Sequence, residues 1–403
     1  SLQAWVCGGS MPVSCYWSVA FCFADSPMGC ACAMLLMTRR ARLNDRLFMS
    51  ILDRYIFGVV LRATLLSLLV LVALQSLFVF LAEFDNVGDA DYGVLAAAGY
   101  LLATMPERII EVMPLAFLLG GLLGMGGLAH GSELVVMRAS GRSVFGLVMA
   151  AMMPGVLLVG VGAWLGEAVA PELSQQANQQ RAMARGKSLS ILQGRGFWAR
   201  NGDEFVHVNR ISPDGHLEGV DVYRIDTDTM RLGGVSRAQS GIYRDGEWHL
   251  QSLTDLELTD QGVIRRSSTE HIWNAAISPR LLGVLALEPD MLSMRDLSLY
   301  AGYLESNGLG ADAHRLAWWT KLVAPVGNLV MLFIAMPLVF GSLRSRGAGQ
   351  RLFVGVLLGL AYFLVNRTLS SVVLAYGFPP VISAVAPPVL FFACGLFAMA
   401  RLR

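Results

Sequence analysis

Six hydrophobic stretches restrict the fold of this chain more than any other feature of its sequence. Each holds roughly the 20 apolar residues that an α-helix needs to cross the hydrocarbon core of a bilayer. Three precede a long polar block and three follow it: Ile56–Leu81, Met113–Leu128 (after a helical approach over Tyr100–Glu111), Val144–Leu165, Trp318–Phe340, Leu352–Leu374 and Val381–Ala400. Charged residues make up only 15% of the chain, against about a quarter in soluble proteins. We therefore predict six membrane spans rather than one large soluble core.

The basic residues beside these stretches indicate how the spans are oriented. With six spans, the flanking arginines fall on one side of the membrane: Arg39, Arg40, Arg42, Arg46, Arg54, Arg138, Arg142, Arg344, Arg346, Arg351, Arg401 and Arg403. The opposite loops, Glu83–Asp91 and Tyr376–Pro380, are acidic or uncharged. Because cytoplasmic loops carry an excess of Arg and Lys, we expect both termini in the cytoplasm and the polar block outside it. The net charge of +1 gives no reason to expect nucleic-acid binding.

The polar block, about residues 168–310, has the pattern of β-structure. β-branched and aromatic residues mark Phe205–Asn209 and Val220–Ile225, and leucines recur through a third stretch that begins at Trp248. Turn-forming pairs separate the runs: Asn201-Gly202, Pro213-Asp-Gly215, Asp245-Gly246 and Gln261-Gly262. Such a pattern predicts a sandwich or a jelly roll. The predicted fold class is a membrane α-helical protein, with six transmembrane helices and an inserted periplasmic all-β jelly-roll domain.

These patterns divide the chain into five segments. We predict transmembrane helices 1–3 over residues 49–167, a β-jelly roll over 168–285, a helical connector over 286–317 and transmembrane helices 4–6 over 318–403. A short cytoplasmic helix at 132–141 joins the second and third spans. Residues 1–48 are rich in Cys, Met and Trp without a clear period. We expect them to be disordered or artefactual, with the natural start at Met37 or Met49; the alternative is a genuine functional extension.

No catalytic, cofactor or metal site is predicted. The Gly186-Lys-Ser188 sequence lacks the Gly that a phosphate-binding loop needs five positions earlier, where Arg181 stands. The six histidines are scattered, and none pair at metal-ligand spacing. Five of the six cysteines lie in the first 32 residues and form neither a disulfide framework nor a zinc pattern.

The segment Gly131–Arg142, GSELVVMRASGR, is the first candidate for function. It holds an acid, Glu133, and a base, Arg138, on a short amphipathic turn between two membrane spans. A soluble partner can bind a membrane protein at a short polar helix in this position. Simple capping of the helix by Glu133 is the alternative.

A second set of candidates lies inside the spans. Arg367, beside Asn366, falls deep in the fifth span, where a charge normally faces a cavity or a partner. It could contact an anionic head group, or it could snorkel or pair with a neighbouring helix. Aromatic residues near the end of the first span, Phe78, Phe80 and Phe84, could line a slot for acyl chains or face bulk lipid.

Two further patterns have structural interpretations. Glycines crowd the second span and recur four residues apart in the fifth, at Gly355 and Gly359. Such residues let helices approach closely, either within one chain or against a partner subunit. Glu107, Arg108 and Glu111 are predicted to form a local network along one helix.

Four motifs resemble the lipopolysaccharide-export permeases of the LptF/LptG family, and more closely its LptG branch. They are LDRYI at Leu52–Ile56, MPLAFLLGGLLGMGGLAHGSELVVMRASG at Met113–Gly141, FGSLRS at Phe340–Ser345 and YGFPP at Tyr376–Pro380. The resemblance runs from about Ser50 to the C-terminus and includes the six-span layout with a β insert. Residues 1–48 lie outside it.

The resemblance implies a permease subunit of an ATP-driven ABC transporter of the Gram-negative inner membrane. Such a subunit is not itself an enzyme and holds no cofactor; ATP and Mg²⁺ bind to a partner ATPase. The implied partners are an LptF-like sister permease, an LptB-like ATPase dimer, an LptC-like single-span bridge protein and an LptA-like periplasmic bridge. The implied substrate is lipopolysaccharide, extracted from the membrane lipid and passed towards the outer membrane by way of a periplasmic jelly roll.

Site residues also follow from the resemblance. Residues 132–141 match the family's coupling helix, so Glu133, Leu134, Val135 and Arg138 are expected to engage the ATPase. Phe78, Phe80, Phe84, Asn366 and Arg367 are expected to contact lipopolysaccharide. One departure is that Val79, Glu83, Asp85 and Asn86 occupy a region where some relatives carry lysines, so phosphate capture would rest elsewhere.

Two other functions remain open at this stage. A different ATP-coupled membrane machine is disfavoured, because that class has four spans with the large domain after the first. A non-transport scaffold that anchors periplasmic partners would require no ATPase docking at Glu133.

Overall fold

The computed structural model describes residues 51–89, 91–185, 196–211, 216–226, 231–244, 247–259, 262–273, 289–341 and 347–401. The chain divides between Ile56 and Phe57, and all contacts discussed below lie within Phe57–Arg403. The predictions for residues 1–48, for Gly186–Ser188, for the turns at Pro213–Gly215 and Asp245-Gly246, and for Arg344 and Arg346 lie outside the described residues.

Six helices are long and apolar enough to cross a membrane, which confirms the predicted number of spans among the described residues. The first three spans are α3 (Ile51–Phe84), α5 (Met105–His130) and α7 (Val144–Trp164), and α7 continues through the π-helix η1 (Leu165–Val169) into α8 (Ala170–Ala184). The last three are α12 (Asp312–Phe340), α13 (Ala348–Tyr376) and α14 (Pro380–Ala400). Shorter helices are α4 (Val94–Ala103), α6 (Glu133–Ala139) and α11 (Met294–Ser306), with a 3-10 turn η2 (Pro289–Met291).

Local sequence explains where several of these helices begin and end. Ser143 caps α7, because its side chain accepts a hydrogen bond from the Gly146 amide at 3.1 Å. Ser293 caps α11 in the same way through the Asp296 amide. Gly377 ends α13 in the left-handed conformation, φ +70°, which glycine adopts without a steric penalty.

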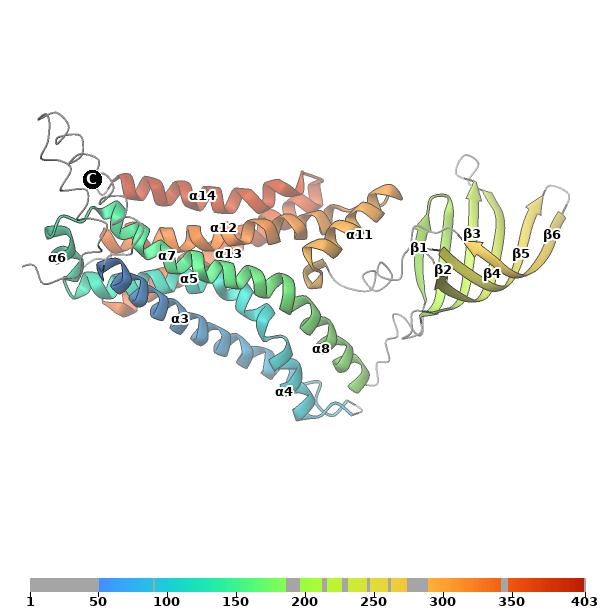
Figure 1. Ribbon diagram of the computed structural model, residues 1–403, viewed down its shortest axis with the longest axis horizontal. Helices are drawn as coiled ribbons and strands as arrows, with labels where there is room; N and C mark the ends of the chain where they lie inside the picture. The colour runs from blue at the N-terminus through green and yellow to red at the C-terminus, as the bar shows by residue number, and fades with distance from the viewer. Residues whose placement is uncertain are drawn as a thin grey trace, which may run out of the picture. The chain divides into compact units, whose positions relative to one another are not determined.

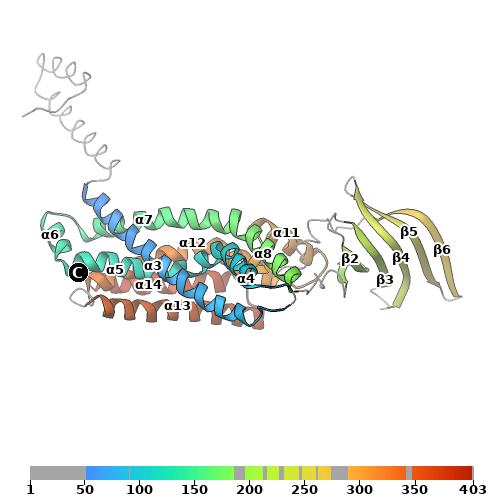
Figure 2. The ribbon, with the colours of Figure 1, turned by 90° about the horizontal axis from the view of Figure 1, so that it is seen from below.

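The helices α5 and α12 form the centre of the bundle (Figures 1 and 2). Helix α5 packs against α12, α13 and α7, while α12 packs against α14, α5 and α7. In their most apolar windows, 61% of α5 and 56% of α12 are buried, against 17% for both α3 and α13. The spans α3 and α13 therefore leave most of their apolar surface uncovered by this chain.

Glycine makes the close contacts of α5 possible. A Cβ at Gly120 would overlap the backbone of Thr64 on α3, and one at Gly121 would lie 2.8 Å from Ala335 on α12. On α13, Gly355 faces Leu119 and Gly359 faces Leu115, both on α5. These glycines pack within the chain, which favours internal packing over packing on a partner subunit.

The insert is a single antiparallel sheet in which each strand pairs with the next. Its strands are β1 (Phe197–Asn201), β2 (Glu204–Ile211), β3 (Leu217–Asp226), β4 (Arg231–Arg244), β5 (Glu247–Thr259) and β6 (Gly262–Trp273). The three predicted strand stretches fall in β2, β3 and β5, and the six apolar helices with an inserted sheet confirm the fold class. The order of the described strands is a meander rather than a Greek key.

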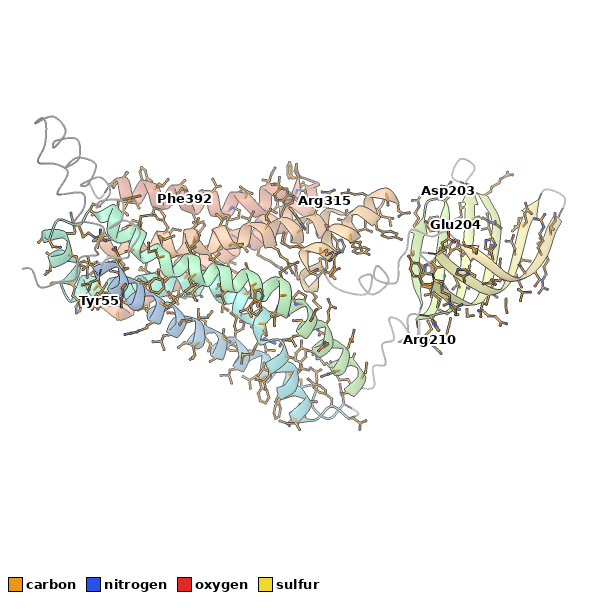
Figure 3. The ribbon with its side chains drawn as sticks, viewed as in Figure 1. Tyr55, Asp203, Glu204, Arg210, Arg315 and Phe392 are labelled. Carbon is orange, nitrogen blue, oxygen red and sulfur yellow. The ribbon has the colours of Figure 1, made fainter. Side chains whose placement is uncertain are left out.

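One face of this sheet is a hydrophobic core. Alternate residues such as Val206, Val220 and Leu250 are at most 1% exposed, and residues of α11, including Tyr303, complete the cluster. The Tyr303 hydroxyl donates to the Arg200 carbonyl at 2.8 Å and accepts from the Arg200 amide. Trp273 Nε1 donates to the Glu204 carboxylate at 3.0 Å and joins the ends of β6 and β2; Glu204 is labelled in Figure 3.

Candidate functional site

The short helix α6 lies at one end of the bundle, between α5 and α7 (Figure 1). The chain enters it through Ser132, which has a left-handed backbone, φ 61°. This conformation costs a non-glycine residue energy and is held by the surrounding structure. The reversal lets α6 turn across the end of the bundle rather than continue α5.

The faces of α6 differ in exposure. Leu134 and Met137 are buried, at 4% and 6% exposed, and anchor the helix on the bundle. Val135 and Val136 are exposed, at 42% and 67%. An acid in the first turn, Glu133, and a base in the last turn, Arg138, each carry a charge opposite to the partial charge of the helix end where they lie, which is favourable.

A cavity of about 380 Å³ lies beside α6. It is lined by Leu134, Val135, Arg138, Ala129, Ala139, Val339 and Phe340. The structure thus brings together three of the predicted coupling residues, Leu134, Val135 and Arg138, with the end of α12. Glu133 is on the exposed surface of the same helix and does not line this cavity.

The predicted substrate-contact residues lie on the two least buried spans. Phe78 and Phe84 of α3 are exposed, at 63% and 53%, and the Phe80 ring packs edge-on against Phe84 with 5.8 Å between centroids. Arg367 of α13 is exposed and Asn366 is partly buried. Within the described part of the chain, neither polar side chain has a hydrogen-bonding partner, so the alternative of an ion pair between Arg367 and a neighbouring helix is not seen.

The contacts that fix the C-terminal end of α3 were not predicted from the sequence. Glu83 is 5% exposed, and both of its oxygens accept hydrogen bonds from Arg181 of α8 at 2.7 Å. The Arg181 guanidinium also lies 4.9 Å from the centre of the Tyr100 ring. A second arginine of this region, Arg185, contacts Asp89 at 3.1 Å. Glu83 is therefore a neutralised structural acid rather than an acid that faces the substrate.

The predicted local network of Glu107, Arg108 and Glu111 is wrong in its partners. Glu107 accepts a hydrogen bond from Ser174 of α8 at 2.6 Å, and Glu111 accepts one from Gln75 of α3 at 2.5 Å. Arg108 donates to the Thr104 hydroxyl at 3.0 Å. The two acids connect α5 to other helices, because Ser174 of α8 and Gln75 of α3 lie within hydrogen-bonding distance of them.

Comparisons with known proteins extend this description. Residues 54–401 match the family described as lipopolysaccharide export system permease LptF/LptG. The lipopolysaccharide export system permease protein LptG of Escherichia coli (strain K12) is 35% identical over 357 residues, which cover 87% of this chain and 98% of the relative. The protein of that name from Haemophilus influenzae is 32% identical over 356 residues, 87% of this chain and 99% of its own. Because the match runs from α3 to α14, this chain belongs to the LptF/LptG family of lipopolysaccharide export permeases, and within it to the LptG type.

Proposed function

We propose that this chain is the LptG-type permease subunit of an ATP-driven transporter that extracts lipopolysaccharide from the inner membrane. The observation that carries the proposal is the family match over residues 54–401. Its six apolar helices support placement in the inner membrane as a multi-pass protein. The proposed sister subunit is an LptF-like permease, and the large uncovered surfaces of α3 and α13 are where it would pack.

The energy for transport is proposed to come from an LptB-like ATPase dimer that binds ATP and Mg²⁺ and docks on α6. The exposed valines of α6 offer an apolar contact, and Glu133 offers a carboxylate that can accept two hydrogen bonds from an arginine. Because Leu134 and Met137 hold the helix on the bundle, a push on α6 would pass directly to α5 and α7.

Lipopolysaccharide is proposed to contact α3 and α13 and then to leave through the β insert. Support comes from the exposed Phe78 and Phe84 rings, which suit acyl chains, and from Arg367, whose charge suits a phosphate. An LptC-like single-span protein and an LptA-like periplasmic protein would receive the lipid. The β insert would then be periplasmic and both chain termini cytoplasmic.

The coupling role is tested by Glu133→Ala in the assembled complex. We expect weaker co-purification of the ATPase or a loss of ATP-driven lipopolysaccharide release of at least tenfold. Glu172→Ala is the matched control, because Glu172 is also an exposed acid in the first turn of a helix, α8. Wild-type assembly and release in Glu133→Ala would contradict the coupling role and favour a non-transport scaffold.

The substrate role of Arg367 has a separate test. Arg367→Ala should reduce photo-crosslinking of lipopolysaccharide to α13. Arg401→Ala serves as the control, since Arg401 is an exposed arginine that follows α14, outside the proposed contact helices. Equal cross-linking in the wild type and in Arg367→Ala would leave Arg367 as a snorkelling residue.

A further inference from the structure

A second cavity is lined by residues of α5, α7, η1, α8, η2, α11 and α12. Its volume is about 350 Å³, within the range of small-molecule sites. Most of its wall is apolar and includes Ile110, Met113, Val159, Leu322 and Pro325. None of its lining residues belongs to α3 or α13, so it is separate from the substrate-contact surface proposed above.

The local helix geometry shapes this cavity. The π-helix η1 interrupts the α-helical ladder between α7 and α8, and such single-turn bulges occur often at functional sites. Gly162 precedes it, and a Cβ there would lie 2.5 Å from Met113 Sδ on α5. A Cβ at Gly166, inside the π-helix, would lie 3.2 Å from Ile110. Because these two glycines have no side chain, α7 and η1 can pack closely against α5 at the cavity wall.

One end of the cavity is charged. Lys321 of α12 lies there and donates to the Leu292 carbonyl, and three acidic residues, Glu107, Glu167 and Asp290, line the same cavity. Glu167 also accepts from the Met294 amide at 3.1 Å. Three carboxylates against one ammonium make this end unfavourable for a phosphate or a carboxylate of a ligand.

The other end holds one polar residue in apolar surroundings. Asn328 lines the cavity, is 6% exposed, and its Oδ1 has no hydrogen-bond partner in the structure as described. It follows Lys321 by seven residues on α12, which corresponds to about 10 Å along the helix. Buried amide oxygens are normally paired, so an unpaired one that lines a cavity points to a ligand that donates a hydrogen bond.

We propose that this cavity binds a single alkyl chain that carries an uncharged hydroxyl group. The apolar wall would contact the chain, the Asn328 amide would accept the hydroxyl proton, and the charged end would exclude anionic head groups. The chain could come from a bilayer lipid or from transported lipid, and the chemistry of the site is the same for both. The proposal does not depend on ATP-driven transport.

The test uses two diazirine-bearing alkyl probes of equal length, one with a hydroxyl in the chain and one without. Both are applied to the detergent-solubilised protein, purified with any subunits that accompany it, and labelled peptides are mapped. We expect labelling of α5, α7 and α12 around the cavity. The hydroxylated probe should label about fivefold more strongly, the equivalent of ~1 kcal/mol for one hydrogen bond.

Two variants and a control make the result specific. Asn328→Leu keeps the apolar volume but removes the amide, so the two probes should label it equally. Ala324→Phe fills the cavity and should abolish labelling by both probes. Ala393→Phe, on the exposed face of α14, is the matched control and should label like the wild type. No labelling at the cavity, or equal labelling by both probes in the wild type, would overturn the proposal.

Competition identifies the source of the chain. Loss of labelling on addition of a phospholipid whose acyl chain carries a hydroxyl indicates a bilayer lipid, whereas loss only with lipopolysaccharide indicates the transported lipid. Both results support the site, and labelling that neither lipid reduces would contradict it. Because no step requires ATP or the coupling helix, failure here is distinguishable from failure of the proposed transport function.

Discussion

Glu83 shows how a single residue can be misjudged from sequence. In the printed chain it is one acid among several after the first span, yet the fold buries it against Arg181, 98 positions later. We predict that Arg181→Ala destabilises the protein by ~2 kcal/mol, because a buried carboxylate loses the two hydrogen bonds that Arg181 donates to it. Thermal unfolding of the purified protein in detergent measures the effect.

The matched control is Arg185→Ala, one turn further along the chain. Its partner Asp89 has a side chain that is 50% exposed, so this pair is worth under ~1 kcal/mol. Equal destabilisation by the two substitutions would show that Glu83 does not depend on Arg181.

Tyr92 leads to a prediction about pH. Burial, and then the neighbouring Glu83 carboxylate, raise the pKa of Tyr92 to about 12. An unfolded tyrosine has a pKa of about 10. The stability that comes from holding Tyr92 neutral is thus complete below pH ~10 and is lost as pH rises towards 12.

We therefore expect the melting temperature of the wild type to fall more steeply between pH 10 and 11.5 than that of Tyr92→Phe. Phenylalanine keeps the ring and cannot ionise, so the difference between the two curves isolates this residue. Parallel curves over that range would contradict the assigned environment of Tyr92.

At the scale of single residues, the sequence predicted which element a side chain lies on better than which side chains it contacts. Leu134, Val135 and Arg138 were placed on one short helix, and the structure gathers them around one cavity. Glu107 and Glu111 were predicted to pair locally but contact Ser174 and Gln75 instead. Such partners depend on which helices become neighbours, and spacing along one helix carries no information about that.

Among the elements, helix α5 depends most on its glycines. A methyl group at Gly120 would overlap Thr64 of α3, whereas nothing lies within 4 Å of a Cβ at Gly127 on the same helix. We predict that Gly120→Ala destabilises the protein by about 1–3 kcal/mol through overpacking. Gly127→Ala should be neutral or slightly stabilising, since alanine favours the helix by up to ~1 kcal/mol. The melting temperatures of the two variants, measured by thermal unfolding under the same conditions, test this prediction. Similar melting temperatures would argue against a close α3–α5 crossing.

The spans were the most predictable elements, because length and apolar composition define them directly. The continuation of a helix beyond its apolar span was not predictable in this way. Helix α7 runs on through η1 and α8 to Ala184, beyond the predicted end at Leu165, since polar residues on α8 find partners on α5 and η2. The strands followed from alternation and turn residues, but the meander order did not, because register between strands leaves no short-range signal.

For the whole molecule, the number of spans decides where each part lies. One span, α7, separates α6 from the β insert, so these two segments must lie on opposite sides of the membrane if α7 crosses it. The arginines near the ends of the spans predict that α6 is on the cytoplasmic side. This arrangement underlies the whole proposal, since an ATPase can reach only the cytoplasmic face and a periplasmic acceptor only the other.

Cysteine labelling in intact cells tests this arrangement. In a variant whose native cysteines are replaced by serine, Gln239→Cys places an exposed thiol on β4 and Ser140→Cys places one at the end of α6. We expect a maleimide that passes the outer membrane but not the inner membrane to label Gln239→Cys in whole cells, and Ser140→Cys only after the inner membrane is permeabilised. The permeabilised sample also controls for reactivity, because both thiols should then react. Labelling of Ser140→Cys alone in whole cells would show that the topology is the reverse of the predicted one. Labelling of both variants would mean that α7 does not cross the membrane.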